Sequence, residues 1–286
     1  MRRVGNLWDW VIAWPKLLLA ARKARRGKRS RGTVRRFEFV REFELLRLAS
    51  ELERGTYRPG PFHTHWITRP KPRLISAAPY RDRVVHHALM NVLEPILDRH
   101  MHPHSYACRR GKGTHAAADR VQALMRRHGY VLQCDVRKYF PSIDHELLKG
   151  MFRRLIKDRR ALALMDLIVD GSNEQEPVLD WFAGDGLFTP TERRRGLPIG
   201  NLTSQWFANW YLTGFDHFVT SHMRCGAYVR DCDDLLLLHA GQPDSGMLLR
   251  RLSGEWVFRR GGSGGESVGR ISGDEPPRPR SGASRA

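Results

Sequence analysis

Two short apolar segments each deliver acidic side chains to one end, and these carboxylates are the groups with the clearest chemistry. Tyr130–Val136 predicts a strand that ends in a carboxylate at Asp135. Residues 227–239 predict two strands joined by a turn that holds Asp233 and Asp234. Carboxylates beside hydrophobic strands are costly unless a cation neutralises them, and their hard oxygens suit Mg²⁺. The alternative is an exposed turn whose acids are only solvated.

Amphipathic helices and one hairpin must position these strands. The predicted helices are Phe37–Arg54 (core positions Phe39, Phe43, Leu46 and Leu48), Asp82–Leu97, a helix capped by Thr114, a helix capped by Asp144, and a helix from Gly200 to Phe218. Residues 62–79 alternate apolar and polar side chains. They predict an extended hairpin with Arg69, Lys71 and Arg73 at its turn.

Composition indicates a partner that carries negative charge. The chain has 286 residues with 49 Lys plus Arg and 30 Asp plus Glu, so its formal net charge is +19. Such a balance is typical of proteins that bind nucleic acid. The four cysteines form no Cys-x-x-Cys pair, which argues against a zinc site or a disulfide scaffold. No apolar run reaches membrane length, so we expect a cytoplasmic protein without a membrane partner.

The segment 22–36 concentrates the positive charge. It holds nine basic residues and no acid. The favoured interpretation is a phosphate-binding arm with Arg25, Arg26, Lys28 and Arg29 as nucleic-acid contacts. A solvated, frayed arm is the alternative.

Five ordered segments resemble the motifs of reverse transcriptases. The first palm motif is similar to LQCDVRKYFPSIDH (132–145), and the middle palm motif is similar to RGLPIGNLTSQWFANWYL (195–212). The Tyr-x-Asp-Asp hairpin is similar to YVRDCDDLLLL (228–238). Two fingers motifs resemble PRLISAAPYRDRVVHHALMNVLEPI (72–96) and HSYACRRGKGTHAA (104–117). The resemblance covers about residues 35–240 and implies an RNA-directed DNA polymerase.

The resemblance also implies a fold and a metal centre. The implied fold is the α+β right-hand polymerase fold with fingers and palm. Two Mg²⁺ ions are implied at Asp135, its neighbour Val136, Asp233 and Asp234. The implied partners are an RNA template, a DNA primer and deoxynucleoside triphosphates (dNTPs).

Nucleotide and template contacts follow from the same motifs. The implied nucleotide-binding residues are Arg73, Arg109, Phe140, Gly200 and Gln205, and Lys71 and Asn201 are implied nucleic-acid contacts. Phe140 matches the bulky residue that acts as a steric gate in the family. A ring at that position would clash with a ribose 2′-hydroxyl. Ordinary alternatives stay open: Lys71 as surface charge, Phe140 as a core aromatic, and Asn201 or Gln205 as helix caps.

The middle palm motif narrows the resemblance. Most bacterial reverse transcriptases carry Gln-Gly-x-x-x-Ser-Pro there, whereas this chain has Ile-Gly-x-x-x-Ser-Gln from Ile199 to Gln205. That form is similar to the reverse transcriptases of diversity-generating retroelements, which copy a template repeat with errors at adenines. The resemblance therefore implies mutagenic diversification of a target gene and a small basic accessory protein as partner.

Two departures from the family pattern bear on activity. Asp231 stands where the hairpin motif has Tyr, and we expect repulsion among the three acids to disturb metal binding. The family-like sequence ends near residue 240, and 23 of the last 34 residues are Gly, Ser, Arg or Pro. We expect a basic extension at 1–60, a fingers and palm domain at 61–240, and a disordered tail at 241–286 in place of a thumb.

Two other functions stay open. One is a decayed reverse transcriptase that keeps its basic surface and only binds RNA. The other is an RNA-maturing intron protein, which is weaker because no maturase or endonuclease segment follows. The 13 histidines show no zinc-like spacing, and we interpret His86 as a surface residue of its helix.

Overall fold

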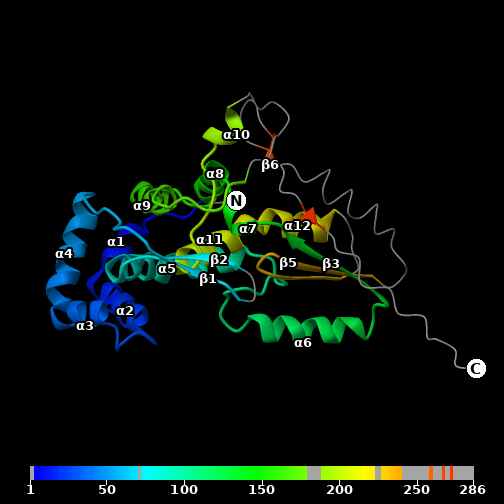
Figure 1. Ribbon diagram of the computed structural model, residues 1–286, viewed down its shortest axis with the longest axis horizontal. Helices are drawn as coiled ribbons and strands as arrows, with labels where there is room; N and C mark the ends of the chain where they lie inside the picture. Colours follow the sequence, from blue (N-terminus) through cyan, green and yellow to red (C-terminus); the bar gives the residue numbers. More distant parts are fainter. Residues whose placement is uncertain are drawn as a thin grey trace, which may run out of the picture.

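The fold consists of a block of helices and a four-stranded sheet that extends from one side of it (Figure 1). The structure is a computed structural model that describes residues 3–69, 72–178, 188–222 and 227–239, with the backbone of 258–259, 266–267 and 271–272. None of the helices in these ranges is both long and apolar enough to cross a membrane.

The N-terminal helices pack around α5 (Tyr80–His100). They are α1 (Trp8–Ile12), α2 (Trp14–Arg25), α3 (Gly32–Phe39) and α4 (Arg41–Arg54). α5 buries the apolar face predicted from its helical spacing, with Val84, Val85, Ala88, Leu89, Leu93 and Leu97 inside. This helix therefore links the N-terminal helices to the rest of the core.

The prediction of one helix at Phe37–Arg54 is wrong. The chain forms α3 and α4, which meet at Val40, where the backbone leaves the helical region (φ −116°, ψ 30°). α4 buries Leu45, Leu48 and Leu52, whereas the predicted core positions Phe39, Phe43 and Leu46 are exposed, Phe39 at 91%. Because a new helix begins after the break, the set of side chains that faces the core differs from the set predicted for one continuous helix.

The basic segment 22–36 is folded, which excludes the frayed arm. α2 continues to Arg25 and α3 begins at Gly32, and Val34 is buried. Arg25 forms an ion pair with Glu38 at 2.9 Å. Four further cations of the segment, Arg26, Lys28, Arg29 and Arg31, are therefore presented by a short loop between two helices.

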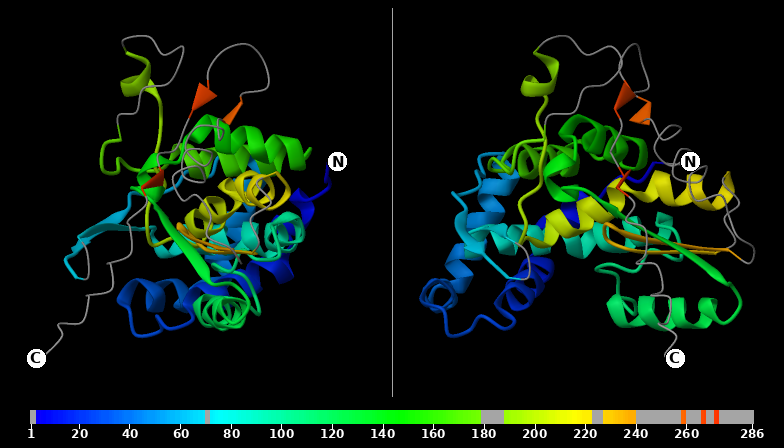
Figure 2. Two further views of the ribbon diagram at one scale, coloured as in Figure 1. Left: turned by 90° about the vertical axis from the view of Figure 1, so that its right-hand side faces the viewer. Right: turned by 45° about the vertical axis from the view of Figure 1, so that its right-hand side comes forward.

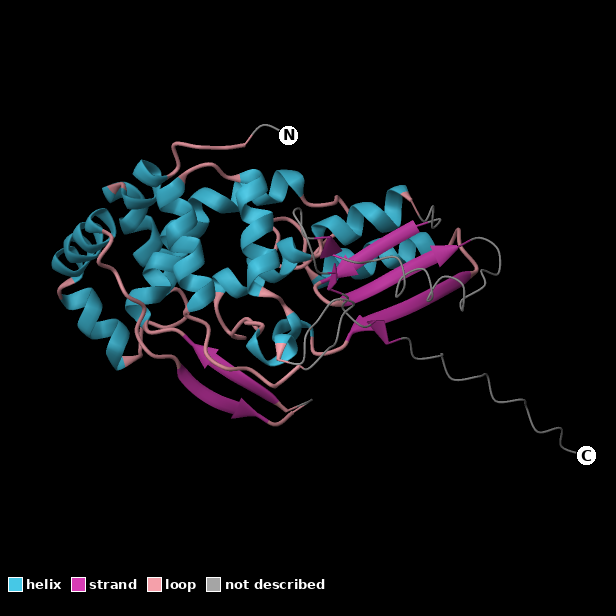
Figure 3. Ribbon diagram, turned by 90° about the horizontal axis from the view of Figure 1, so that it is seen from above, coloured by secondary structure: helices cyan, strands magenta, loops and turns pink. Residues whose placement is uncertain are grey.

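A two-stranded hairpin stands clear of the helices (Figure 3). β1 (His63–Ile67) and β2 (Arg73–Ala77) are antiparallel, as predicted, with His63 opposite Ala77. Lys71 lies outside the described residues, whereas Arg73 is exposed beside the turn. The other edge of β2 contacts a distant loop, because the amide of Ser76 donates to the carbonyl of Ile199 at 2.9 Å.

The main sheet has the strand order β4–β5–β3–β8. Its strands are β4 (Ala227–Asp231), β5 (Asp234–His239), β3 (Tyr130–Val136) and β8 (Ile271–Ser272), and neighbours are antiparallel. β3 has the predicted bounds, and β4 and β5 form the predicted hairpin. β6 (Phe258–Arg259) and β7 (Glu266–Ser267) pair separately, and the remainder of the predicted tail lies outside the described residues.

Helices lie on both sides of the sheet (Figure 2). α12 (Thr213–Ser221) lies on one side and α6 (Thr114–Met125) on the other. The remaining helices are α7 (Tyr139–Ser142), α8 (His145–Leu155), α9 (Arg159–Asp170), α10 (Thr189–Glu192) and α11 (Leu202–Tyr211). The helix predicted from Gly200 to Phe218 is thus two helices, α11 and α12, separated at Leu212.

Two helix caps were predicted, and one is confirmed. The carboxylate of Asp144 accepts a hydrogen bond from the amide of Leu147 at 2.9 Å, which caps α8. Thr114 is the first residue of α6 and not its cap, because Gly113 holds the cap position without a side-chain bond. Gly113 has φ 108°, a conformation that favours glycine over threonine at that position.

Candidate active site

Three carboxylates form a row across the main sheet. In the strand register, Asp135 of β3 lies opposite Asp234 of β5, and Asp231 of β4 lies opposite the same Asp234. Directly opposed residues of antiparallel strands point to one face with Cβ atoms about 4.5–5.5 Å apart. Their neighbours Cys134, Leu235 and Arg230 are buried on the other face. The row therefore lies on the face away from the main core.

The fourth carboxylate lies at the turn of the β4–β5 hairpin. Cys232 and Asp233 form the turn, and Cys232 adopts φ 63°. The amide of Val136 donates to the carbonyl of Asp233 at 3.3 Å, which ties the turn to the end of β3. Burial, and then the charge of Asp135, raise the pKa of Asp233, whereas the nearby Arg73 opposes that shift. Asp233 therefore lies close to both Asp135 and the hairpin cation.

The donor set suits a hard divalent cation. Asp135, Asp233 and Asp234 offer carboxylate oxygens from two adjacent strands and their turn. Val136 has a buried apolar side chain, so it can offer only its backbone carbonyl. Within the described ranges, no three acidic, His or Cys side chains already converge as a metal site. The chemistry of these donors therefore fits Mg²⁺.

The loop before α11 is fixed against β2. Gly200 has φ 114°, and a Cβ there would lie 3.0 Å from the Cγ2 of Ile75. Both the conformation and the close approach require glycine. Gly200 therefore supports the junction between the β1–β2 hairpin and α11.

Asn201 belongs to the same junction, which corrects its predicted role. Its side chain is buried, the Oδ1 atom accepts from the amide of Ala78 at 2.9 Å, and the Nδ2 atom donates to the carbonyl of Ser76 at 2.8 Å. These bonds occupy its amide group. Asn201 is thus a structural residue and not a nucleic-acid contact.

Gln205 has the opposite environment. It is exposed on α11, between the buried Ser204 and Trp206. A polar side chain on the open face of an otherwise buried helix is available to a ligand. Gln205 therefore stays in the predicted nucleotide-binding set.

Phe140 follows β3 closely in sequence and is half-buried. It lies in α7, five residues after Asp135, with its ring 5.8 Å from that of Tyr139. Its carbonyl accepts from the amide of Leu197 at 2.9 Å, which connects α7 to the loop before α11. The ring is thus held by its neighbours and still partly accessible.

The two predicted phosphate-binding arginines have different environments. Arg73 is exposed and lies within electrostatic reach of Asp233. Arg109 is buried, with its Nε 2.5 Å from the carboxylate of Asp98 and its Nη1 donating to the carbonyl of Ser105 at 2.9 Å. Arg109 therefore stabilises its own loop, whereas Arg73 is open to solvent near the carboxylates.

His86 is also corrected. It is buried, and its Nδ1 atom lies 3.4 Å from the hydroxyl of Thr203. Burial, with the neighbouring His87 and Arg83, lowers the pKa of His86 to about 3. His86 is therefore a neutral core residue where α5 meets α11.

The sequence motifs do not single out Arg230. Its guanidinium is fully buried below the carboxylate row and is paired with Asp216, which is also fully buried, at 2.6 Å. A single arginine within an apolar strand is the sequence signal for such a residue. If the strand is buried, the cation requires an acidic partner elsewhere in the chain.

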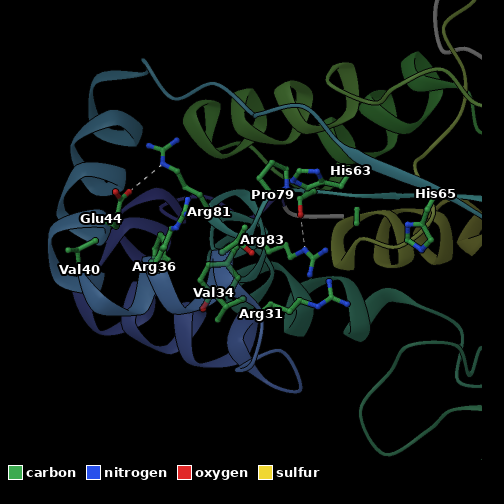
Figure 4. Close-up of a pocket in the computed structure, with 15 residues that line it drawn as sticks. Arg31, Val34, Arg36, Val40, Glu44, His63, His65, Pro79, Arg81 and Arg83 are labelled. Atoms are coloured by element: carbon green, nitrogen blue, oxygen red, sulfur yellow. Dashed lines mark hydrogen bonds and ion pairs between the residues drawn. The ribbon is translucent and has the colours of Figure 1, made fainter.

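A basic pocket lies near the other end of the β1–β2 hairpin (Figure 4). It has a volume of about 460 Å³, and its basic lining residues are Arg31, Arg36, Arg81, Arg83, His63 and His65. Glu44, its acidic lining residue, lies 4.0 Å from Arg81. Burial and the charge of Arg31 lower the pKa of Arg83, and burial with these two arginines lowers the pKa of Lys28. Such mutual repulsion favours binding of an anion.

Comparison with known proteins identifies relatives of this chain. The family model described as "Reverse transcriptase (RNA-dependent DNA polymerase)" matches residues 65–254, more than half of the chain. Protein YkfC of Escherichia coli (strain K12) is 27% identical over 195 residues, which cover 66% of this chain and 48% of that protein. Group II intron-encoded protein LtrA of Lactococcus lactis subsp. cremoris is 24% identical over 182 residues, 62% of this chain and 28% of that protein. The chain thus spans less than half the length of these relatives.

Solved structures also resemble the chain. A chain of a partial Cas6-RT-Cas1–Cas2 complex superimposes with a TM-score of 0.48 and 19% identity, covering 86% of this chain and 40% of that chain.

Proposed function

The chain belongs to the reverse transcriptase family, and from that premise we propose that it is an RNA-directed DNA polymerase. The observation that carries the proposal is the juxtaposition of Asp135 with Asp234 across β3 and β5, with Asp233 at the adjoining turn. Carboxylates from separate strands that meet at one edge are what a nucleotidyl-transfer site needs to share two divalent ions.

The chain's own residues divide the work of the reaction. Asp135, Asp233 and Asp234 would hold two Mg²⁺ ions. When bound, these ions would supply activation of the primer 3′-hydroxyl and neutralisation of the leaving pyrophosphate. Arg73 neutralises the triphosphate from the hairpin side, and Gln205 contacts the template or the incoming nucleotide. Phe140 selects deoxyribose by excluding a 2′-hydroxyl.

The basic surface supplies the grip on RNA. Arg26 and Arg29 are exposed in the loop between α2 and α3, and Lys28 is partly buried beside Arg31 and Arg83. We assign phosphate contacts to this group. Arg25 contributes less than predicted, because its guanidinium is paired with Glu38.

The type of reverse transcription is a finer proposal. The Ile-Gly-x-x-x-Ser-Gln form of the middle palm motif supports a role in a diversity-generating retroelement, with a small basic accessory protein as partner. Copying would then introduce errors opposite template adenines. Sequencing of the cDNA made from an RNA of known sequence tests this, and equal error rates at all four bases would contradict it.

Asp231 favours a second candidate function, binding of RNA without synthesis. It places a third carboxylate opposite Asp234, which adds repulsion to the metal site. Under the polymerase proposal, Asp231→Tyr increases extension modestly, by a factor of a few, because the essential carboxylates are already in place.

Primer extension separates the two functions. The chain and its Asp231→Tyr form are given an RNA template, a DNA primer, dNTPs and Mg²⁺, and RNA binding is measured in parallel. Extension by the native chain supports the polymerase, and a modest gain in Asp231→Tyr supports the effect assigned to Asp231. Tight RNA binding with no extension by either protein would establish the RNA-binding remnant.

A further inference from the structure

The buried guanidinium of Arg230 contacts the turn that carries Asp233. Its Nη1 atom donates to the carbonyl of Cys232 at 2.9 Å and to the Oδ1 atom of Asn209 at 2.8 Å. Its Nε and Nη2 atoms each lie 2.6 Å from the carboxylate of Asp216. One planar group therefore connects β4, the turn, α11 and α12.

The turn needs such support. Cys232 adopts φ 63°, which is uncommon for a residue with a side chain and is maintained only when the surroundings hold it. The β4 backbone is fixed separately, since the amide of Arg230 donates to the carbonyl of His104 at 2.9 Å and its carbonyl accepts from the amide of Tyr106 at 2.8 Å. The side chain of Arg230 then extends this anchorage beyond the end of β4 to the turn.

α11 brings a second functional group into the same assembly. Asn209 lies four residues, about one helical turn, after Gln205. Asn209 is itself held, because its Nδ2 donates to the carbonyl of Ala107 at 2.7 Å and its Oδ1 accepts from the hydroxyl of Ser105 at 3.0 Å. The exposed face of α11 and the turn are therefore positioned by one buried network.

We propose that Arg230 is a positioning residue that fixes the Cys232–Asp233 turn relative to α11, so that the carboxylate of Asp233 is presented correctly to Mg²⁺. The proposal rests on the polymerase function for its catalytic consequence. Its structural content, a turn held by one guanidinium, is independent of that function.

The test compares Arg230→Lys with Tyr228→Phe. Lysine keeps a charge for Asp216 but lacks the fork that also reaches the carbonyl of Cys232. The control removes the Tyr228 hydroxyl, which donates to Asp216 at 2.6 Å, and leaves the turn contacts intact. Both variants perturb the same buried acid, so loss of stability alone does not distinguish them.

The first readout is the Mg²⁺ concentration that half-saturates incorporation of a single dNTP. For Arg230→Lys we expect an increase of about tenfold or more, because loss of partners that orient metal ligands typically costs about 10–100-fold in metal affinity. Tyr228→Phe is expected to leave the value unchanged. Equal Mg²⁺ dependence in the two variants would overturn the catalytic consequence.

The second readout does not need activity. Cys232 is half-buried, so its thiol is partly shielded from solvent while the turn is held. Release of the turn should speed alkylation of this thiol, followed by peptide mass spectrometry, several-fold in Arg230→Lys and not in Tyr228→Phe. If the native chain shows no incorporation, the polymerase proposal fails while this readout still decides the positioning role. An unchanged alkylation rate in Arg230→Lys would overturn that role.

Discussion

Asp135 lies directly opposite Asp234 in the register of β3 and β5, although the two residues are distant in sequence. The pairing places both carboxylates on the face of the sheet away from the main core. It also brings the end of β3 to the turn at Asp233, whose carbonyl accepts the Val136 amide. The acidic edge is thus a consequence of strand register, and the predictions below follow from it.

Asp233→Asn should abolish extension without destabilising the fold at pH 7. Burial and the Asp135 charge raise the pKa of Asp233. Between the unfolded and folded pKa values, the folded chain therefore retains a proton that the unfolded chain has lost. Ionised Asp233 therefore lowers stability above that folded pKa. Below the ordinary aspartate pKa of about 3.9 both states are protonated and the effect disappears.

Thermal unfolding without metal measures this. The melting temperature of Asp233→Asn should equal or exceed that of the native chain at pH 7, with the difference narrowing toward about pH 4. A variant that is clearly less stable at pH 7 would show that the carboxylate is well solvated or neutralised.

Phe140→Val should relax sugar selection. The smaller side chain opens space where the ring would meet a 2′-hydroxyl, and steric discrimination of this kind is worth on the order of tenfold to a hundredfold. The ratio of kcat/KM values for ribo- and deoxynucleotides measures the effect. Tyr139→Phe keeps the neighbouring ring and should leave the ratio unchanged, and no change in Phe140→Val would mean that Phe140 is only a core aromatic.

Arg73→Ala should raise the KM for dNTPs by about tenfold or more, because a hydrogen bond to a charged group contributes roughly 1.5–3 kcal/mol. Arg69→Ala removes a cation from the same exposed turn and serves as the control. Steady-state kinetics at saturating primer–template provides the comparison. Equal KM values for the two variants would place the triphosphate elsewhere.

The basic pocket and the neighbouring Lys28 should control the salt dependence of RNA binding. Each lost phosphate contact on single-stranded RNA lowers the slope of log affinity against log salt by about 0.7. Lys28→Ala, Arg31→Ala and Arg83→Ala together should reduce the slope by roughly two units, measured by fluorescence anisotropy. Arg154→Ala, a single exposed cation of α8, should reduce it by no more than one, and an unchanged slope in the triple variant would exclude the pocket.

Local sequence patterns predicted those elements whose residues follow a regular period. The strand Tyr130–Val136, the β4–β5 hairpin and the apolar face of α5 are confirmed, because alternation and helical spacing depend on near neighbours. The helix predicted at Phe37–Arg54 failed for a tertiary reason. Its exposed Phe39 and Phe43 have the same apolar character as the buried Leu45 and Leu48, and only packing against the other helices distinguishes them.

The sequence predicted the site residues that a motif specifies. It did not predict the residues whose role depends on burial in the folded chain. Asp135, Asp233 and Asp234 come from motifs with fixed spacing. The roles of Arg109 and Asn201 could not be read in this way. Arg109 is buried against Asp98 and Ser105 only because of how its own loop folds, and the partners of Asn201, Ser76 and Ala78, lie far away in sequence. The role of Arg230 could not be predicted either, because its contacts with Asp216 and Asn209 form only in the folded chain.

The most direct test of the central claim is Mg²⁺-dependent incorporation of one deoxynucleotide on an RNA template, by the native chain and by Asp135→Asn. The account predicts incorporation by the native chain that EDTA abolishes. It predicts that Asp135→Asn lowers the rate by about a hundredfold or more. Loss of a residue that only orients a metal ligand costs about 10–100-fold, and Asp135 is assigned as a ligand itself. Equal rates for the two proteins, or no incorporation by a native chain that binds primer–template tightly, would contradict it.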